Sequence, residues 1–265
     1  MTSDRLRAVT ERLKKIAAGG ARLEAKMLIE AAGNDADSLE SLVQRRLAGE
    51  PADRLAGRRG FWTLDLIVTP DVLSPRPDSE TIVELACDLV LETHARHAAL
   101  RILDLGTGSG ALLLALLAEF PMATGLGIDI STPALEVARR NAARNGLAEQ
   151  AAFAHGVWLE GLSERFDLIL SNPPYISTGE IAGLEIEVRE HDPALALDGG
   201  LDGLDAYRAI LPVLSGFLAH GGIAVFEIGY GQESAVTRLA DAVGLKVVSI
   251  KNDLSRIPRA IAMSC

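Results

Sequence analysis

Cysteine and aromatic residues are scarce in this sequence, and long hydrophobic runs are missing from it. The 265 residues include two cysteines, Cys87 and Cys265, and aromatic side chains make up 4% of the chain. Two cysteines exclude a framework of several disulfides and a zinc site with four cysteine ligands. No stretch of about 18 uncharged apolar residues occurs, as a membrane span would require, and residues 1–15 lack the apolar core of a signal peptide. We therefore expect a cytoplasmic protein without a membrane segment.

Basic residues are also in deficit, since 26 Lys and Arg stand against 36 Asp and Glu and give a formal net charge of −10. Residues 1–60 contain 12 basic and 9 acidic side chains, whereas residues 61–265 contain 14 and 27. An acidic body is poorly suited to general nucleic-acid binding, because phosphates are neutralised by Lys and Arg. We expect no stable nucleic-acid partner, although one local basic patch would still allow a nucleic-acid enzyme. The histidines show no metal-ligand spacing, so no metal site is predicted.

Helical periodicity characterises the first 50 residues. Leu6, Val9 and Leu13 recur at spacings of three and four, and two further stretches repeat this pattern. Glycines separate the stretches, and Ser38 could cap the third helix. The pattern predicts a helical domain over residues 1–55, which is either a packing appendage or a substrate-recognition domain.

Apolar residues crowd between positions 61 and 68, bounded by Gly57, Gly60 and Pro70. Such a stretch favours a β-hairpin. We expect residues 56–75 to link the helical domain to the rest of the chain.

Apolar strands alternate with helices from residue 78 onward. The strands are expected at residues 102–105, 126–130, 150–154, 166–170, 223–228 and 247–250. The helices are expected near residues 78–95, 110–119, 132–145, 204–218 and 231–243. This alternation predicts a mostly parallel sheet with helices on both faces, formed by residues 76–265.

A glycine-rich segment, residues 104–110, falls between the first predicted strand and the following helix. Gly106, Gly108 and Gly110 would let the backbone approach a ligand closely. Asp129 stands 19 residues after Gly110, at the end of the second strand, where a carboxylate can accept hydrogen bonds from both ribose hydroxyls of a nucleoside. The glycine spacing differs from that of dinucleotide-binding loops, and no Walker lysine follows. The segment predicts a cofactor of the nucleoside type.

The fourth predicted strand ends in Asn172-Pro173-Pro174-Tyr175. The prolines fix φ and lack N–H groups, so the Asn172 side-chain oxygen and the Pro173 carbonyl could accept two hydrogen bonds from one planar NH2 group. Tyr175 could stack on the flat group that carries it. An amide nitrogen is a weak nucleophile, and fixed acceptors would orient its lone pair and stabilise the developing positive charge. The alternative is a proline-rich turn that merely ends a strand.

Several separate segments together resemble HemK/PrmC-type N5-glutamine methyltransferases, which modify the glutamine of the Gly-Gly-Gln loop in peptide-chain release factors. They are residues 70–80, which include Pro75-Arg76-Pro77-Asp78-Ser79-Glu80, residues 104–110, residues 127–131, residues 172–175, residues 198–204 with Tyr207 and Arg208, and residues 226–229 with Gln232. The Asn-Pro-Pro-Tyr corner is shared with DNA adenine methyltransferases. The segment around Arg76 and residues 198–204 are specific to the glutamine methyltransferases.

The resemblance implies a Rossmann-like class I methyltransferase fold with a seven-stranded, mostly parallel sheet, a small N-terminal helical domain and a linking β-hairpin. It implies S-adenosyl-L-methionine as the cofactor and peptide-chain release factors as protein substrates bound by the helical domain. The implied cofactor-binding residues are Gly106, Thr107, Gly108, Ser109, Gly110, Asp129, Trp158 and Asn172. The implied substrate-binding residues are Asn172, Pro173, Pro174 and Tyr175, with Asn172, Pro173 and Tyr175 in the catalytic role.

Three alternatives stay open at this point. The substrate could be a glutamine of a ribosomal protein. It could also be an exocyclic amine of a nucleic acid, but the acidic residues after the corner would repel phosphates and disfavour this second alternative. Val157 stands where the family often has an acidic residue before the tryptophan, which raises the possibility of a cofactor-binding protein without catalysis. The intact corner argues against that reading.

Arg76, held between two prolines, is interpreted as a residue of the site rim or of a structural ion pair.

Overall fold

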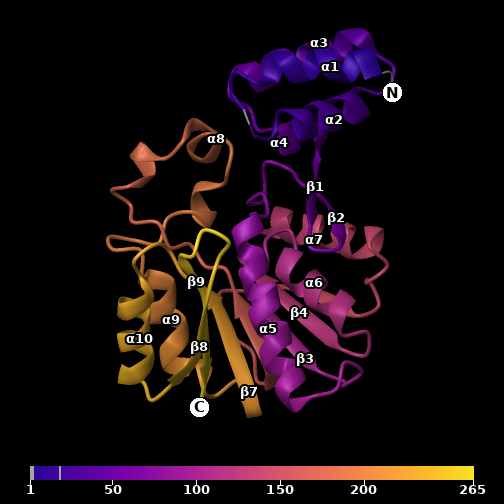
Figure 1. The fold of residues 1–265 in the computed structure, drawn as a ribbon. Coiled ribbons are helices and arrows are strands. Elements are labelled where there is room, and N and C mark those ends of the chain that lie inside the picture. Colours follow the sequence, from indigo (N-terminus) through magenta and orange to yellow (C-terminus); the bar gives the residue numbers. More distant parts are fainter. Residues whose placement is uncertain (1–2, 18) are drawn as a thin grey trace.

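The computed structural model describes residues 3–17 and 19–265. Four helices form the N-terminal group in Figure 1: α1 (Ser3–Leu13), α2 (Ala21–Ala32), α3 (Ala36–Leu47) and α4 (Ala52–Ala56). They enclose a hydrophobic core of their own, in which Leu13, Leu28 and Val43 are completely buried. The short fourth helix was not predicted from the sequence pattern.

The expected cap of α3 at Ser38 is wrong, because the helix begins earlier. Asp35 has an extended backbone, and its carboxylate accepts hydrogen bonds from the backbone N–H groups of Asp37 and Ser38. An aspartate in this conformation satisfies the free amides of the first turn. Ser38 therefore lies inside the helix.

The expected hairpin is present as the antiparallel strands β1 (Arg58–Phe61) and β2 (Leu64–Ile67). Phe61, Leu64 and Leu66 are buried in the core of the α/β part of the chain. The Asn141 side chain accepts a hydrogen bond of 2.6 Å from the backbone N–H of Ile67 and donates one of 3.2 Å to its carbonyl. The hairpin is therefore fixed to the α/β part by apolar packing and by a bridging amide.

Helices and strands alternate through the rest of the chain. In chain order they are the 3-10 turn η1 (Pro77–Ser79), α5 (Glu80–Thr93), β3 (Arg101–Leu105), α6 (Ala111–Glu119), β4 (Thr124–Asp129), α7 (Thr132–Arg144), β5 (Ala151–His155), β6 (Phe166–Ser171), the 3-10 turn η2 (Ile181–Gly183), α8 (Ile186–Arg189), the 3-10 turn η3 (Ala194–Ala196), α9 (Asp205–Leu214), β7 (Leu218–Glu227), α10 (Glu233–Ala242), β8 (Lys246–Asn252) and β9 (Pro258–Ser264).

Seven strands form one sheet in the order β5-β4-β3-β6-β7-β9-β8. The pairs from β5 to β7 are parallel, whereas β9 runs antiparallel to β7 and β8. This confirms the predicted fold class. The strand pattern had missed β9 and had placed the end of α9 too late, since that helix ends at Leu214 and Gly216 follows in the turn.

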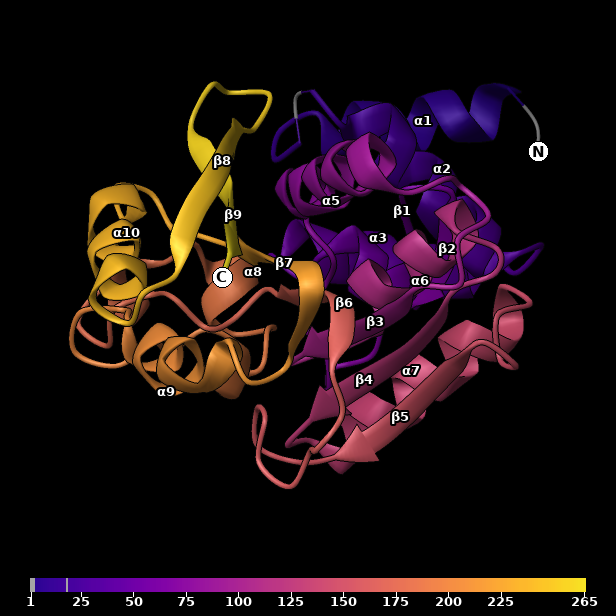
Figure 2. The ribbon, with the colours of Figure 1, turned by 90° about the horizontal axis from the view of Figure 1, so that it is seen from below.

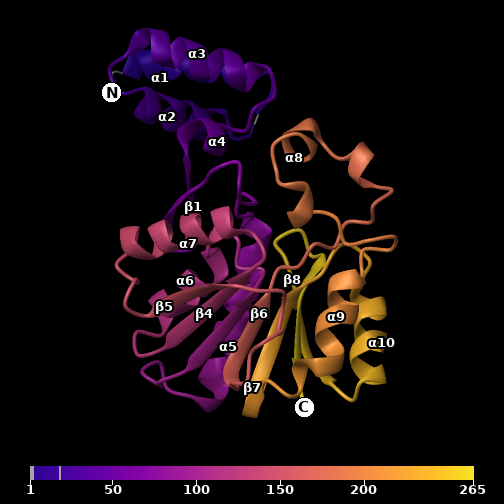
Figure 3. The same cartoon turned by 180° about the vertical axis from the view of Figure 1, so that it is seen from behind.

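The sheet is covered on both faces, as Figure 2 shows. Apolar side chains of α5 and α6 pack on one face and those of α9 and α10 on the other. The parallel strands carry their carboxyl ends toward the N-terminal helices, and the segment that contains α8 lies beyond those ends (Figure 3). Within the two described ranges, no helix is long and apolar enough to cross a membrane.

Candidate active site

A cavity of about 340 Å³ lies at the carboxyl ends of β3, β4 and β6. Open α/β sheets bind ligands at this edge, where the strand order reverses. The residues that were predicted from the sequence and that line this cavity are Gly106, Thr107, Gly108, Ser109, Asp129, Trp158, Asn172 and Pro174. Gly110, Pro173 and Tyr175 are absent from its wall.

The glycine loop is held by the strand beside it. The backbone N–H groups of Gly106 and Thr107 donate hydrogen bonds of 2.8 and 3.0 Å to the Ile128 carbonyl. The Gly108 N–H donates to Asp129 Oδ2 at 2.8 Å. Gly106 and Gly108 have φ angles of +71° and +53°, a region in which side chains are strained. The loop conformation thus requires glycine and depends on the carboxylate at the end of β4.

Gly110 contributes to packing behind the loop. It is the residue before α6, with φ +82°, and a Cβ atom there would lie 3.2 Å from Leu114 and 3.4 Å from Ala138. Gly110 does not line the cavity, and its expected role toward a cofactor stays a prediction. It lets the helix begin close to its neighbours.

Asp104, at the base of the glycine loop, was not assigned a role of its own from the sequence. Its side chain is buried, and Oδ2 accepts a 2.7 Å hydrogen bond from the Thr107 hydroxyl. Oδ1 has no hydrogen-bond partner among the residues that the structure describes. Burial raises the pKa of this carboxyl to about 7. The cavity therefore contains a buried acceptor without a partner.

A second cavity of about 280 Å³ lies on the other side of Asn172, which lines both cavities. Tyr175, Glu227 and Arg259 line this second one. Pro174 faces the first cavity, and the buried Pro173 lines neither. The four corner residues are thus distributed around a junction, with the Asn172 side chain at its centre.

Two contacts hold the polar side chains of the corner. Asn172 Nδ2 donates a 3.2 Å hydrogen bond to the Ser79 hydroxyl at the start of α5. The Tyr175 hydroxyl donates a 3.0 Å hydrogen bond to Glu227 Oε1. Burial raises the pKa of the Tyr175 phenol, as does the neighbouring Glu227, so the tyrosine stays neutral. Ser79 and Glu227 stand in segments that carried the family resemblance, but the sequence assigned neither of them a role at the corner.

The backbone of the corner is braced by two segments that carried the family resemblance. Gln232 Nε2 donates to the carbonyls of Tyr175 and Gly203 at 2.9 and 3.2 Å. A Cβ atom at Gly203 would lie 2.2 Å from the Tyr175 carbonyl oxygen, and this glycine has φ +74°. Only glycine fits at this close approach. Gly203 and Gln232 therefore shape the corner without lining the first cavity.

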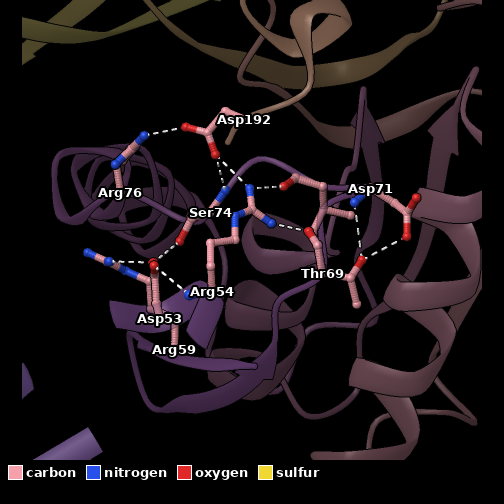
Figure 4. A network of polar contacts seen from close by, with 9 residues as sticks. Asp53, Arg54, Arg59, Thr69, Asp71, Ser74, Arg76 and Asp192 are labelled. Atoms are coloured by element: carbon pink, nitrogen blue, oxygen red, sulfur yellow. Dashed lines mark hydrogen bonds and ion pairs between the residues drawn. The ribbon is translucent and has the colours of Figure 1, made fainter. Parts of the chain in front are cut away.

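Arg76 lines both cavities and also belongs to a buried ionic network (Figure 4). The Asp192 carboxylate accepts hydrogen bonds from Arg54 of α4 and from Arg76. The neighbouring Asp53 accepts from Arg59 and from the Ser74 hydroxyl. Arg76 is therefore both a residue of the cavity rim and a member of a structural ion pair, as the two interpretations expected. The network joins the N-terminal helices to the edge of the site.

The described part of the chain contains no group of three or more His, Cys, Asp or Glu side chains placed to hold a metal ion.

Comparison with known proteins places this architecture in a family. Residues 78–189 match the family model "Methyltransferase small domain". The chain is 49% identical over 239 residues to a release factor glutamine methyltransferase of Bradyrhizobium diazoefficiens, covering 90% of this chain and 79% of that protein. It is 40% identical over 271 residues to a release factor glutamine methyltransferase of Xylella fastidiosa, with coverages of 98% and 96%.

The fold is also found among solved structures. A crystal structure of a methyltransferase from Pyrococcus furiosus superposes with a TM-score of 0.55 at 18% identity, over 83% of this chain and 96% of that chain. At that identity the likeness concerns the fold alone. The high identity to the two curated relatives, over most of each chain, decides the family: this protein belongs to the release factor glutamine methyltransferases.

Proposed function

We propose that the protein transfers a methyl group from S-adenosyl-L-methionine to the side-chain amide nitrogen of the glutamine in the Gly-Gly-Gln loop of peptide-chain release factors. The observation that carries this proposal is the position of Asn172, which lines both cavities and stands between them. A group held in the second cavity against Asn172 would meet a cofactor in the first.

The first cavity fits this cofactor in size and in charge. Its volume of about 340 Å³ is in the range of small-molecule sites. The unpartnered oxygen of the buried Asp104 favours a ligand that carries positive charge. Asp129, which lines the wall, has a carboxylate that can accept hydrogen bonds from ribose hydroxyls. When bound, S-adenosylmethionine supplies a methyl group activated by its sulfonium sulfur.

The residues proposed to hold the cofactor are Gly106, Thr107, Gly108, Ser109, Asp129, Trp158 and Asn172. Gly110 supports them from behind, at the start of α6. Val157 also lines the cavity, and its apolar side chain cannot accept a hydrogen bond from an adenine amine.

The corner residues are proposed to act on the glutamine amide. The Asn172 side-chain oxygen and the Pro173 carbonyl accept its two N–H hydrogens, and the Tyr175 ring packs on its plane. These acceptors direct the nitrogen lone pair and stabilise the positive charge that develops on nitrogen. The neutral amide of Asn172 suffices for this task, and the proton is lost from the product nitrogen after transfer.

The N-terminal helices are proposed to recognise the release factor, as a domain of residues 1–55 followed by the linker 56–75. Two arginines of these helices contact the segment that follows the corner. Arg46 Nη1 lies 2.7 Å from a Glu187 carboxylate oxygen in α8, and Arg54 Nη2 lies 2.6 Å from Asp192 Oδ1. A protein bound to the helices would therefore lie next to the entrance of the second cavity.

A methyl-transfer assay with labelled S-adenosylmethionine tests the function. A purified release factor, its Gly-Gly-Gln variant with Ala for Gln, a ribosomal protein and DNA are offered in parallel. We expect label on the release factor alone, and its loss in the loop variant. Label only on DNA or on the ribosomal protein would overturn the substrate. No label on any substrate, despite measurable cofactor binding, would favour the non-catalytic alternative.

A further inference from the structure

We propose that Ser79 and Glu227 are positioning residues that fix which end of the Asn172 side-chain amide faces the substrate. This inference rests on the proposed function, because orientation matters only if Asn172 must accept a hydrogen bond. It adds two residues, from segments far apart in the sequence, to those that prepare the site.

The need for a positioning residue follows from the chemistry of an asparagine side chain. The amide carries an acceptor oxygen at one end and a donor NH2 group at the other, and both ends have nearly the same shape. A rotation of the amide by half a turn would present N–H donors to the glutamine NH2 group and remove the acceptor. Something in the protein must therefore distinguish the two ends.

Ser79 provides that distinction. Asn172 Nδ2 donates to its hydroxyl oxygen at 3.2 Å, which leaves Asn172 Oδ1 as the free end. Ser79 is the residue that precedes α5, a position at which a serine hydroxyl usually accepts a backbone N–H of the first turn. Here the side chain makes no such cap. The buried hydroxyl is committed to the Asn172 side chain instead.

Glu227 in turn determines whether the Ser79 hydroxyl donates a hydrogen bond to Asn172 or accepts one from it. This carboxyl lies at the end of β7, where burial raises its pKa and the nearby Ser79 and Tyr175 hydroxyls oppose that rise. Its Oε2 atom has no hydrogen-bond partner within the described ranges. In the proposal, the Ser79 hydroxyl gives its hydrogen to this free Oε2 atom, and it then offers only lone pairs to Asn172. Ser79 can then bind the NH2 end of Asn172 and not its oxygen.

The same carboxyl also holds the other residue that contacts the glutamine. Tyr175 donates its hydroxyl hydrogen to Glu227 Oε1 at 3.0 Å. Two charged residues near this carboxyl affect its pKa in opposite directions: Arg259 lowers it and Asp78 raises it. One buried acceptor is therefore positioned to set both the plane of the tyrosine ring and the direction of the Asn172 amide.

Ser79→Ala and Ser79→Thr form the matched test, because threonine keeps the hydroxyl that alanine removes. We expect Ser79→Ala to lower kcat about tenfold, which corresponds to one hydrogen bond of ordinary strength. The KM for the release factor should change less than about threefold, and Ser79→Thr should restore most of kcat. A kcat of Ser79→Ala close to wild type, or an equal loss in Ser79→Thr, would overturn the proposal.

A spectroscopic readout tests the orientation without turnover. The chain has five asparagines, so selective 15N-asparagine labelling gives few side-chain signals, and the signal missing in Asn172→Asp identifies Asn172. Its NH2 hydrogens should exchange slowly with solvent in the wild type and in Ser79→Thr, and faster in Ser79→Ala. Equal exchange in all three proteins would contradict the hydrogen bond to Ser79.

Glu227→Gln supplies an independent variant of almost unchanged shape. Its new NH2 group can donate to Ser79 and compete with Asn172, so kcat should fall at least as far as in Ser79→Ala. A Glu227→Gln enzyme with wild-type kcat would remove Glu227 from the proposal. If the wild type methylates no release factor, the proposed function fails, while the exchange experiment still decides how Asn172 is oriented.

Discussion

The site has two halves, the glycine loop and the Asn-Pro-Pro-Tyr corner, and a buried carboxyl group lies at the base of each. The two carboxyl groups differ in how far along the chain their hydrogen-bond partners lie. Asp104, below the glycine loop, accepts a hydrogen bond from Thr107, three positions away. Glu227, below the Asn-Pro-Pro-Tyr corner, accepts one from Tyr175, which is 52 positions away. One oxygen of each carboxyl has no hydrogen-bond partner in the described part of the chain.

The same contrast holds for the whole of each half. The glycine loop is closed by a hydrogen bond from Gly108 to Asp129 over 21 positions, within one strand–helix–strand unit. The Asn172 amide is held by Ser79 over 93 positions. A locally held loop and a corner held from a distance should respond to different substitutions. Cofactor binding and methyl transfer should therefore be separable by mutation.

Asn172→Ala gives the largest expected effect and breaks the corner alone. Loss of the amide acceptor should lower turnover by about two orders of magnitude or more, as for the removal of an oxyanion-hole donor. Cofactor affinity should change far less, because the glycine loop keeps its own contacts. Initial rates and calorimetric titration of the cofactor measure the two quantities. Turnover near the wild-type value would remove Asn172 from the role proposed for it.

Asp104→Asn tests the carboxyl on the glycine-loop side through its pH dependence. Burial raises the pKa of Asp104 to about 7, above its value near 4 in an unfolded chain. The folded state thus binds this proton more tightly, and the resulting stability is complete below pH ~4 and is lost as the pH rises through ~7. Between pH 5 and 7 the free energy of unfolding should fall by about 2 kcal/mol more in the wild type than in Asp104→Asn.

Denaturant unfolding of both proteins across this pH range makes the comparison. Other titrating groups, Glu227 among them, are common to the two proteins and cancel in the difference. Parallel pH profiles would show that the Asp104 carboxyl is not buried without a partner.

Gly127→Ala damages the glycine-loop half alone. A Cβ atom at this position of β4 would lie 2.7 Å from Phe153 Cδ1 and 2.8 Å from the Thr107 hydroxyl oxygen. Displacement of Thr107 should weaken cofactor binding about tenfold, or ~1.4 kcal/mol, with little change of turnover at saturating cofactor. Gly183→Ala is the matched control, because nothing lies within 4 Å of the added atom. Equal affinities in the two variants would contradict the tight packing of the loop.

Tyr175→Phe gives the smallest effect and sharpens the role of the distant carboxyl. It keeps the ring and removes only the hydroxyl that donates to Glu227. The loss of about 1 kcal/mol of positioning should lower turnover about fivefold and leave cofactor affinity unchanged. A drop as large as that of Asn172→Ala would mean that the hydroxyl itself takes part in the reaction.

The sequence predicted the parts of the site that are built from neighbouring residues. The glycine spacing and Asp129 predict a nucleoside site because one strand–helix–strand unit contains all of its parts. The corner is recognisable because four consecutive residues carry its chemistry. By contrast, Ser79 resembles an ordinary helix cap and Glu227 an ordinary strand end. Their roles appear only when the sheet brings the two segments to Asn172 and Tyr175.

The fold shows the same limit. The alternation of helices and strands predicted the parallel part of the sheet, since each βαβ unit has a local pattern. Strand β9 was missed because the short apolar run from Ala260 to Met263 follows β8 without an intervening helix. Its antiparallel position between β7 and β8 is set by long-range pairing, which periodicity does not report.

The most direct test of the account is to locate the transferred methyl group. A purified release factor is incubated with the enzyme and S-adenosylmethionine, digested, and sequenced by tandem mass spectrometry, with Asn172→Ala as the parallel control. The account predicts one added methyl group on the side chain of the Gly-Gly-Gln glutamine, and almost none with the variant. A methyl group on another residue, or equal modification by both enzymes, would contradict it.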